Sequence, residues 1–193
     1  MQIIYNEVKD FIIKHSEDIS TCNFDAVFSF AQEELREDEH LKELMDVFQK
    51  ANIDFIKHMS YIPTWAYSTT KTASVFVTPG HVKYIEAFGL GNMPNVKEIN
   101  ITGNIKSIGV KGLCNCPNLE TVVIDEGLHE LRGGAFHHCW KLGDVYLPRS
   151  LSSISHVPSM IMTEQRNQVT FHVYENTPAH RHVELCKYRY KLN

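Results

Sequence analysis

The sequence lacks a hydrophobic run long enough to cross a membrane. Its 193 residues contain no stretch of 18 consecutive apolar side chains, whereas a transmembrane helix needs about 20. The first residues, MQIIYNEVKDFIIKHSED, lack the basic flank of a secretory signal and carry charges within their apolar stretch. We therefore expect a cytoplasmic protein with no membrane partner.

The chain also lacks a strong excess of charge of either sign. Its formal net charge is −4, and residues 53–193, with 11 acidic and 14 basic side chains, are only weakly basic. Nucleic-acid binding, which favours a clustered basic surface, is not indicated. Cysteine is scarce and odd in number, at five residues. Without an export signal, reduced thiols are the expected state.

What the sequence does contain is a repeat of 23 residues, visible as columns of apolar side chains. Two of these columns stand two positions apart, and others follow nine and seventeen positions after the first. The first column is Ile53, Phe76, Ile99, Val122 and Val145; the second is Phe55, Thr78, Ile101, Ile124 and Leu147; the third is Ile62, Ile85, Ile108, Leu131 and Ile154; the fourth is Thr70, Met93, Cys116, Cys139 and Met162.

This periodicity predicts a solenoid. Apolar residues at alternating positions are typical of a strand with one buried face. One unit cannot bury its apolar side alone, but stacked units can, because parallel pairing places like residues about 4.8 Å apart. We expect five stacked turns over residues 53–162.

The repeat resembles a known family. The stretch LETVVIDEGLHELRGGAFHHCWKLGDVYLPRSLSSI is similar to the pattern LxxVxLPxSLxxIxxxAFxxCxxL of BspA-like leucine-rich repeats, and the resemblance covers residues 53–193. It implies an α+β fold: a right-handed leucine-rich-repeat solenoid of about five 23-residue turns with a parallel sheet. Earlier turns depart from the pattern, since Thr70 and Met93 replace the cysteine.

Both ends of the solenoid are predicted to be capped, because a bare strand edge invites aggregation. Residues 1–52 carry apolar side chains at helical spacing and predict a helical N-terminal cap. Residues 163–193 predict a small α/β C-terminal cap. There, VTFHV (169–173) reads as a strand shifted by one residue, Thr177–Pro178 begins a short helix ending near Cys186, and a final strand follows.

Cysteine and histidine residues form the clusters that most resemble a chemical site. Cys116 and Cys139 stand 23 residues apart, close enough for a disulfide in principle, but a column of buried thiols fits the reducing context better. Together with Cys114, they have the ligand types of a zinc site when His137 and His138 are added. We expect Cys116 to point inward and Cys114 outward, so these ligands do not converge and no metal is predicted.

A second histidine-rich patch is formed by His172, His180 and His182 near Cys186, and is interpreted as surface histidines. No nucleophile is placed beside a base on a strained turn, and no glycine-rich loop leads from a strand into a helix. We therefore predict that the protein is not an enzyme and requires no cofactor.

The remaining candidates lie on the exposed side of the predicted strands, which such solenoids commonly use for binding. An apolar centre surrounded by carboxylates and an aromatic anchor is typical of an interface. The alternative is that β-branched residues there satisfy strand propensity; for the tryptophan, it is partly buried packing. The candidate binding residues are Val77, Glu98, Asn100, Thr121, Val123, Asp144, Tyr146 and, on the opposite side, Trp140.

The leading hypothesis is a protein-binding module that uses the exposed strand face and the helical cap. Short relatives without export signals occur in bacterial viruses and their hosts, so the resemblance implies a small intracellular inhibitor or adaptor. Two alternatives remain open: a structural protein that forms a homodimer through residues 1–52, and a metal-dependent Cys/His module.

Overall fold

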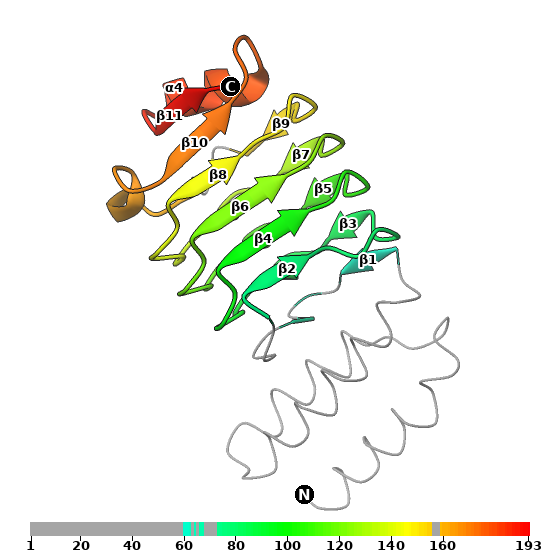
Figure 1. Ribbon diagram of the computed structural model, residues 1–193. Coiled ribbons are helices and arrows are strands. Elements are labelled where there is room, and N and C mark those ends of the chain that lie inside the picture. Colours follow the sequence, from blue (N-terminus) through cyan, green and yellow to red (C-terminus); the bar gives the residue numbers. More distant parts are fainter. Residues whose placement is uncertain (1–59, 63, 65, 68–72, 156–158) are drawn as a thin grey trace, which may run out of the picture. The chain divides into compact units, whose positions relative to one another are not determined.

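The computed structural model describes residues 60–62, 64, 66–67, 73–155 and 159–193 (Figure 1). The described residues belong to one unit, Ser60–Asn193. The helices predicted within residues 1–52, and the first predicted strand near Ile53, lie outside the described residues. No helix within the described ranges has the length and apolar character of a membrane span.

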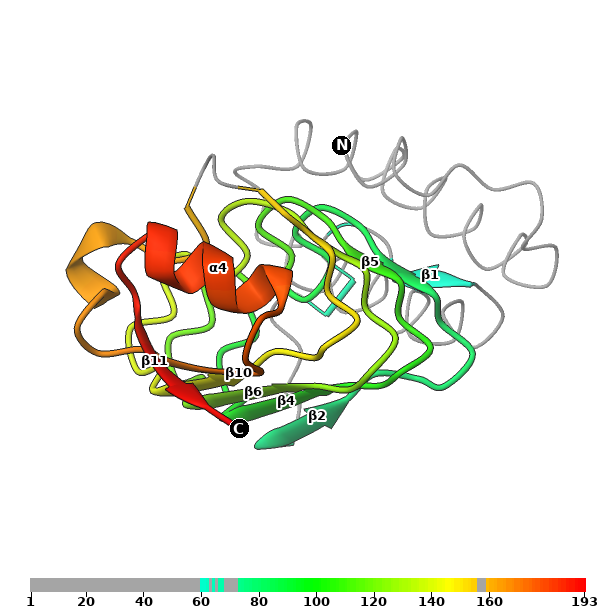
Figure 2. The ribbon, with the colours of Figure 1, turned by 90° about the horizontal axis from the view of Figure 1, so that it is seen from above.

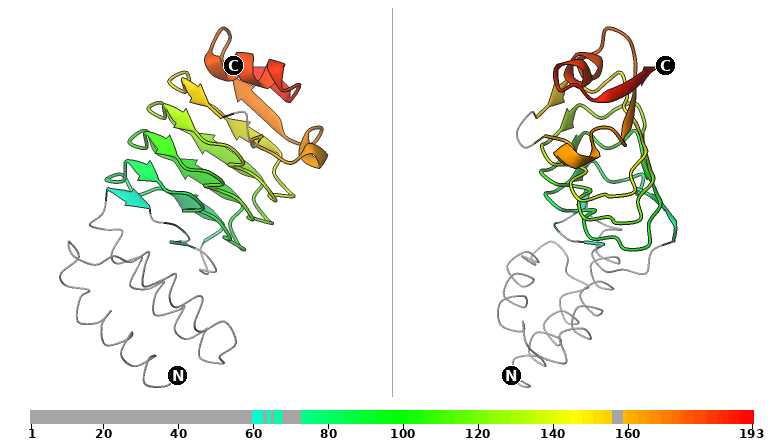
Figure 3. Two further views of the ribbon diagram at one scale, coloured as in Figure 1. Left: turned by 180° about the vertical axis from the view of Figure 1, so that it is seen from behind. Right: turned by 90° about the vertical axis from the view of Figure 1, so that its left-hand side faces the viewer.

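The described residues form a solenoid whose strands pair in two parallel sheets (Figures 1 and 3). The six-stranded sheet has the order β11-β10-β8-β6-β4-β2 and the five-stranded sheet the order β1-β3-β5-β7-β9. Strands of the six-stranded sheet are β2 (Val75–Val77), β4 (Glu98–Ile101), β6 (Thr121–Ile124), β8 (Asp144–Tyr146), β10 (Thr170–Val173) and β11 (Arg189–Leu192). Strands of the five-stranded sheet are β1 (Tyr61–Ile62), β3 (Tyr84–Ile85), β5 (Ser107–Ile108), β7 (Glu130–Leu131) and β9 (Ser153–Ile154).

The strand register confirms the periodicity read from the sequence. Ile99 of β4 pairs with Val122 of β6, which pairs with Val145 of β8, so partners stand 23 residues apart. The five-stranded sheet keeps the same spacing, as Ile85 pairs with Ile108. This second sheet was not predicted, because each of its strands is only two residues long and offers no alternation to detect.

The core consists of the predicted columns stacked inside the coil. Because equivalent residues of successive turns lie one above the other, each column is a continuous apolar stack that no single turn could bury. Members of these columns are 0–2% exposed and include Ile85, Ile99, Ile108, Leu113, Cys116, Val122, Leu131, Phe136, Cys139 and Val145.

The C-terminal cap contains the helix and the final strand that the sequence predicts. Helix α4 (Pro178–Leu185) begins after Thr177, whose hydroxyl accepts a hydrogen bond from the His180 N–H (3.1 Å). This is the arrangement of an N-cap residue followed by a first-turn proline. Seen along the stack, α4 lies across the end of the coil, and β11 follows it at the border of the six-stranded sheet (Figure 2).

The register of β10 differs from the expected shift of one residue. Phe171 pairs with Val145, 26 residues earlier, so the shift relative to the repeat is three residues. The connection from β9 contains a short 3-10 helix, η1 (Thr163–Gln165), which has no equivalent in the earlier turns. The shift places Thr170 beside Asp144 and His172 beside Tyr146.

Candidate functional site

The outward side chains of the six-stranded sheet form two columns, which we call the outer face. Strand pairing aligns them across the turns, since alternate residues of a strand point to the same side. The first column is Val75, Glu98, Thr121, Asp144, Thr170 and Arg189. The second is Val77, Asn100, Val123, Tyr146, His172 and Lys191. Seven of the eight predicted binding residues are thereby brought together on one face.

The character of the outer face changes along the stack. At β2 it is apolar, with Val75 and Val77 46% and 55% exposed. At β4 it becomes polar, and the Asn100 side-chain amide donates to the Glu98 carboxylate (2.8 Å). Thr121 and Val123 of β6 are half-buried. A partner surface would therefore meet apolar and hydrogen-bonding groups in a fixed order.

Three side chains interlock on β8 and β10. The ring of His172 stacks on Tyr146 with centroids 4.0 Å apart and planes inclined by 14°. His172 Nε2 lies 2.7 Å from Asp144 Oδ1, within hydrogen-bonding distance. The histidine is 8% exposed and Tyr146 36%. Because the buried imidazole is held by the carboxylate, it fixes the orientation of the exposed tyrosine ring above it. We call Asp144, Tyr146 and His172 the aromatic cluster.

The prediction missed His172 as part of this face. It grouped His172 with His180 and His182, but the structure separates them. His182 Nε2 lies 3.6 Å from Cys186 Sγ, and His180 Nε2 lies 3.5 Å from Glu184 Oε1 on the same helix. The signal that would have found His172 is the three-residue shift of β10, which depends on how the chain packs through η1 and is not readable from the repeat pattern.

The Cys116–Cys139 column is a ladder of thiols, as expected. All described cysteines are free. The Cys116 thiol donates to the carbonyl oxygen of Leu90 (3.4 Å), and the Cys139 thiol to that of Leu113 (3.1 Å). Each thiol therefore satisfies a backbone acceptor left inside the coil. The hydrogen bond with Cys116, together with burial, raises the pKa of Cys139 well above its usual value.

Cys114 does not point outward as predicted: it is 1% exposed. The small thiol fits inside the turn, whereas the larger ring of His137 at the equivalent position is half-buried and its Nε2 lies 2.7 Å from the Ser159 carbonyl oxygen. Burial lowers the pKa of His137. Among the described residues, no three His, Cys, Asp or Glu side chains converge as metal ligands would.

Trp140 lies apart from the outer face, in the turn between β7 and β8. It is 48% exposed, and its indole contacts the ring of His138 edge-on, with centroids 5.6 Å apart. Its carbonyl oxygen accepts a hydrogen bond from the Gln168 side chain (2.6 Å). The backbone is thus anchored while the side chain is partly in solvent, so Trp140 forms a separate apolar spot.

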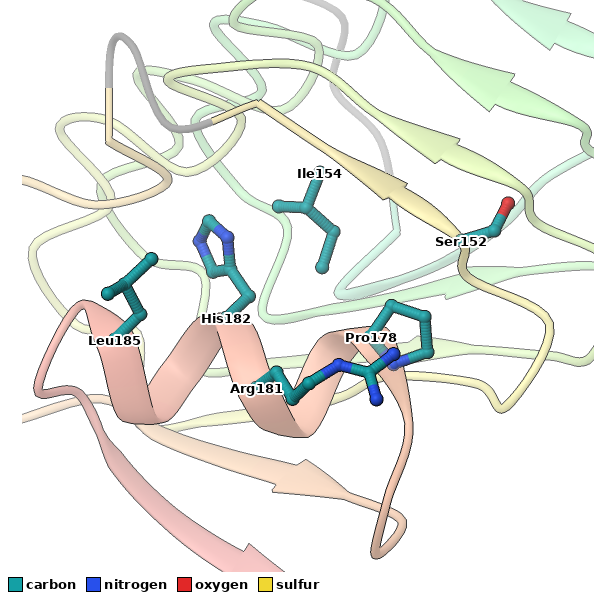
Figure 4. Close-up of a pocket in the computed structure, with 6 residues that line it drawn as sticks. All are labelled: Ser152, Ile154, Pro178, Arg181, His182 and Leu185. Atoms are coloured by element: carbon teal, nitrogen blue, oxygen red, sulfur yellow. The ribbon is translucent and has the colours of Figure 1, made fainter.

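A hollow of about 220 Å³ lies between β9 and α4 (Figure 4). Ile154 and Leu185 approach it from opposite sides, and Arg181 lies at its rim; Ser152, Pro178 and His182 complete the lining. Small-molecule sites usually enclose roughly 300–1,000 Å³. The hollow is therefore small for such a ligand, and the extended outer face is the stronger candidate site.

The buried thiols lead to a prediction about their reactivity. Burial, with a smaller contribution from the neighbouring Cys116, raises the pKa of Cys114 to about 11. The thiolate is the reactive form, so at pH 8 we expect Cys114 to be alkylated by iodoacetamide at least about tenfold more slowly than half-buried Cys186. Peptide mass spectrometry of the labelled native protein measures both rates.

The same shift has a consequence for stability. Because the folded protein holds the Cys114 proton more tightly than the unfolded chain, the stabilisation is present below the ordinary thiol pKa and is lost as the pH rises through about 11. Equal labelling of Cys114 and Cys186 in the native protein would contradict the buried position of Cys114.

Comparison with known proteins agrees with this architecture. The model of the family described as "BspA type Leucine rich repeat region" matches residues 45–157 in six copies. Among solved structures, a leucine-rich cell surface protein from Faecalibacterium prausnitzii is similar, with 18% identity and a TM-score of 0.31. The match covers 48% of this chain and 34% of that one, so the chain corresponds to about a third of the length of that protein. No curated protein matches.

Proposed function

Because the chain belongs to the BspA-type leucine-rich repeat family, we propose that it is a non-enzymatic binding protein whose outer face holds a protein partner. Repeat proteins of this kind present extended surfaces that are suited to other proteins. The observation that carries the proposal is the aromatic cluster: an exposed tyrosine held in a fixed orientation on a sheet of mixed apolar and polar side chains.

The aromatic cluster has the physical properties of a binding hot spot. Tyrosine is enriched at such positions because it buries a large area and still offers a hydroxyl group. Ordering a flexible side chain on binding costs roughly 0.5–1.5 kcal/mol, and the stack on His172 reduces this cost for Tyr146 because its ring is already packed in the free protein.

Neighbouring side chains extend the contact area in both directions. Val123 lies beside Tyr146 on β6, and Val77 stands in the same column two turns further along. Carboxylates of Glu98 and Asp144 flank this column. The combination of an apolar centre with polar neighbours resembles the composition of specific interfaces, and it favours a folded protein surface as the partner.

The test is affinity capture from a lysate of the source organism with a variant that carries both Tyr146→Ala and Val123→Glu. We expect the recovery of the specific partner to fall at least about tenfold, because the variant removes the aromatic anchor and places a charge in the apolar centre. The matched control carries Tyr84→Ala and Val110→Glu, two exposed residues away from the outer face, and should recover the partner as well as the wild type. A partner recovered equally by both variants rejects the outer face.

We place this binding in the cytoplasm and assign the chain the role of a small inhibitor or adaptor; the identity of the captured partner tests both assignments. The alternative of a homodimer through residues 1–52 falls on residues that the structure does not describe.

A further inference from the structure

Strand β11 forms one border of the six-stranded sheet. Within the described ranges, β10 is the one strand that pairs with it. Unpaired strand edges carry a row of free N–H and C=O groups that can pair with another chain. Figures 1 and 2 show β11 as the outermost strand at the C-terminal end of the stack.

The pairing with β10 determines which backbone groups are free. The Asn193 N–H donates to the Val173 carbonyl oxygen (2.9 Å). In a parallel ladder every second residue bonds to the same neighbour, so Arg189 and Lys191 also face β10. The N–H and C=O groups of Tyr190 and Leu192 consequently point to the opposite side, away from the sheet.

The side chains around this edge are basic. Lys187, Arg189 and Lys191 are exposed, and no described carboxylate forms a salt bridge with any of them. Arg189 and Lys191 belong to the two columns of the outer face. Leu192, which points to the other side of the strand, is 50% exposed. Basic side chains on one side and an apolar one on the other thus flank the free backbone groups.

We propose that the free edge of β11 accepts an extended acidic segment of a partner protein as an additional strand. The backbone of the segment pairs with Tyr190 and Leu192. Its side chains alternate, so that acidic residues lie beside Arg189 and Lys191 and apolar residues lie beside Leu192; directly opposed side chains in a ladder are about 4.5–5.5 Å apart. A second copy of β11 is disfavoured at this edge because it would bring the same cations together.

This inference does not depend on the proposed function of the outer face, because the backbone edge rather than the aromatic cluster makes the principal contact. The probe is a fluorescently labelled eight-residue peptide of alternating glutamate and valine, with a lysine–valine peptide of equal length for comparison. Fluorescence anisotropy with the full chain gives both dissociation constants. We expect the acidic peptide to bind at least about tenfold more tightly, and the difference to shrink at high salt.

Two variants separate the backbone contribution from the charge contribution. Leu192→Pro removes an N–H that points away from β10, a substitution that an edge strand tolerates; it should weaken the acidic peptide at least about tenfold with an unchanged thermal midpoint. Arg189→Glu with Lys191→Glu should weaken it to a similar extent. The charge-matched control, Lys83→Glu with Lys141→Glu, should stay within twofold of the wild type.

The results that would overturn the proposal are equal affinity for the two peptides, or acidic-peptide binding that is unchanged by Leu192→Pro. Either would mean that the cations of β11 only keep the edge soluble. The variant with Tyr146→Ala and Val123→Glu should bind the acidic peptide as the wild type does, which distinguishes failure of the edge from failure of the outer face.

Discussion

Replacing Phe136 by alanine is expected to lower the free energy of unfolding by about 3–5 kcal/mol. Phe136 is among the largest fully buried side chains and stands in the column that Leu113 and Leu90 occupy in the preceding turns. Its removal loses the transfer free energy of the ring and leaves a cavity that the stacked turns above and below cannot close. Denaturant unfolding followed by circular dichroism measures the change.

The control for this experiment is Trp140→Ala, four residues further along the chain. Trp140 is a larger aromatic residue but is half-exposed, so we expect a loss below about 1 kcal/mol. An equal loss for the two variants would show that residue size, rather than position in the buried column, determines stability, and would contradict the assignment of Phe136 to the core.

Replacing Gly127 by alanine is expected to destabilise the protein by more than about 3 kcal/mol. Gly127 has a φ of 127°, a backbone conformation that side chains with a Cβ rarely adopt. An added Cβ would also overlap the carbonyl oxygen of Gly103 on the preceding turn. Since this obstacle is backbone, relief requires that two turns move apart, which would disturb the register of the coil. Thermal unfolding monitored by circular dichroism measures the loss.

Gly80→Ala is the matched control. A Cβ at Gly80 would meet no atom closer than Asn104 Nδ2, at 3.9 Å, and the residue has no positive φ. We expect a change within about 0.5 kcal/mol, or a slight stabilisation, since alanine restricts the unfolded chain. A Gly127→Ala variant as stable as Gly80→Ala would mean that neighbouring turns are further apart at Gly127 than the structure places them.

The features that could be predicted from the sequence are those that repeat. A column such as Ile99, Val122 and Val145 states the same physical requirement several times, and parallel stacking of like residues is the arrangement that satisfies all of them together. The thiols of Cys116 and Cys139 were assigned to the core by the same reasoning. The C-terminal helix was also predictable, because Thr177–Pro178 is a local signal that does not depend on tertiary packing.

The features that were missed depend on packing outside the repeat. The position of His172 follows from a three-residue shift that has no precedent in the earlier turns. Cys114 was expected to point outward by analogy with the rest of its column, but a thiol is small enough to turn into the coil where a histidine is not. The free edge of β11 required knowledge of which strand pairs with β10.

Site-specific photo-crosslinking tests most directly the claim that the outer face binds a partner. A benzophenone amino acid is placed at Val123, in the centre of the outer face, and separately at exposed Val110, which lies in neither sheet. After irradiation in a lysate of the source organism, we predict a covalent adduct of one defined mass from position 123 and none from position 110. Adducts from position 110 with none from position 123 would contradict binding through the outer face.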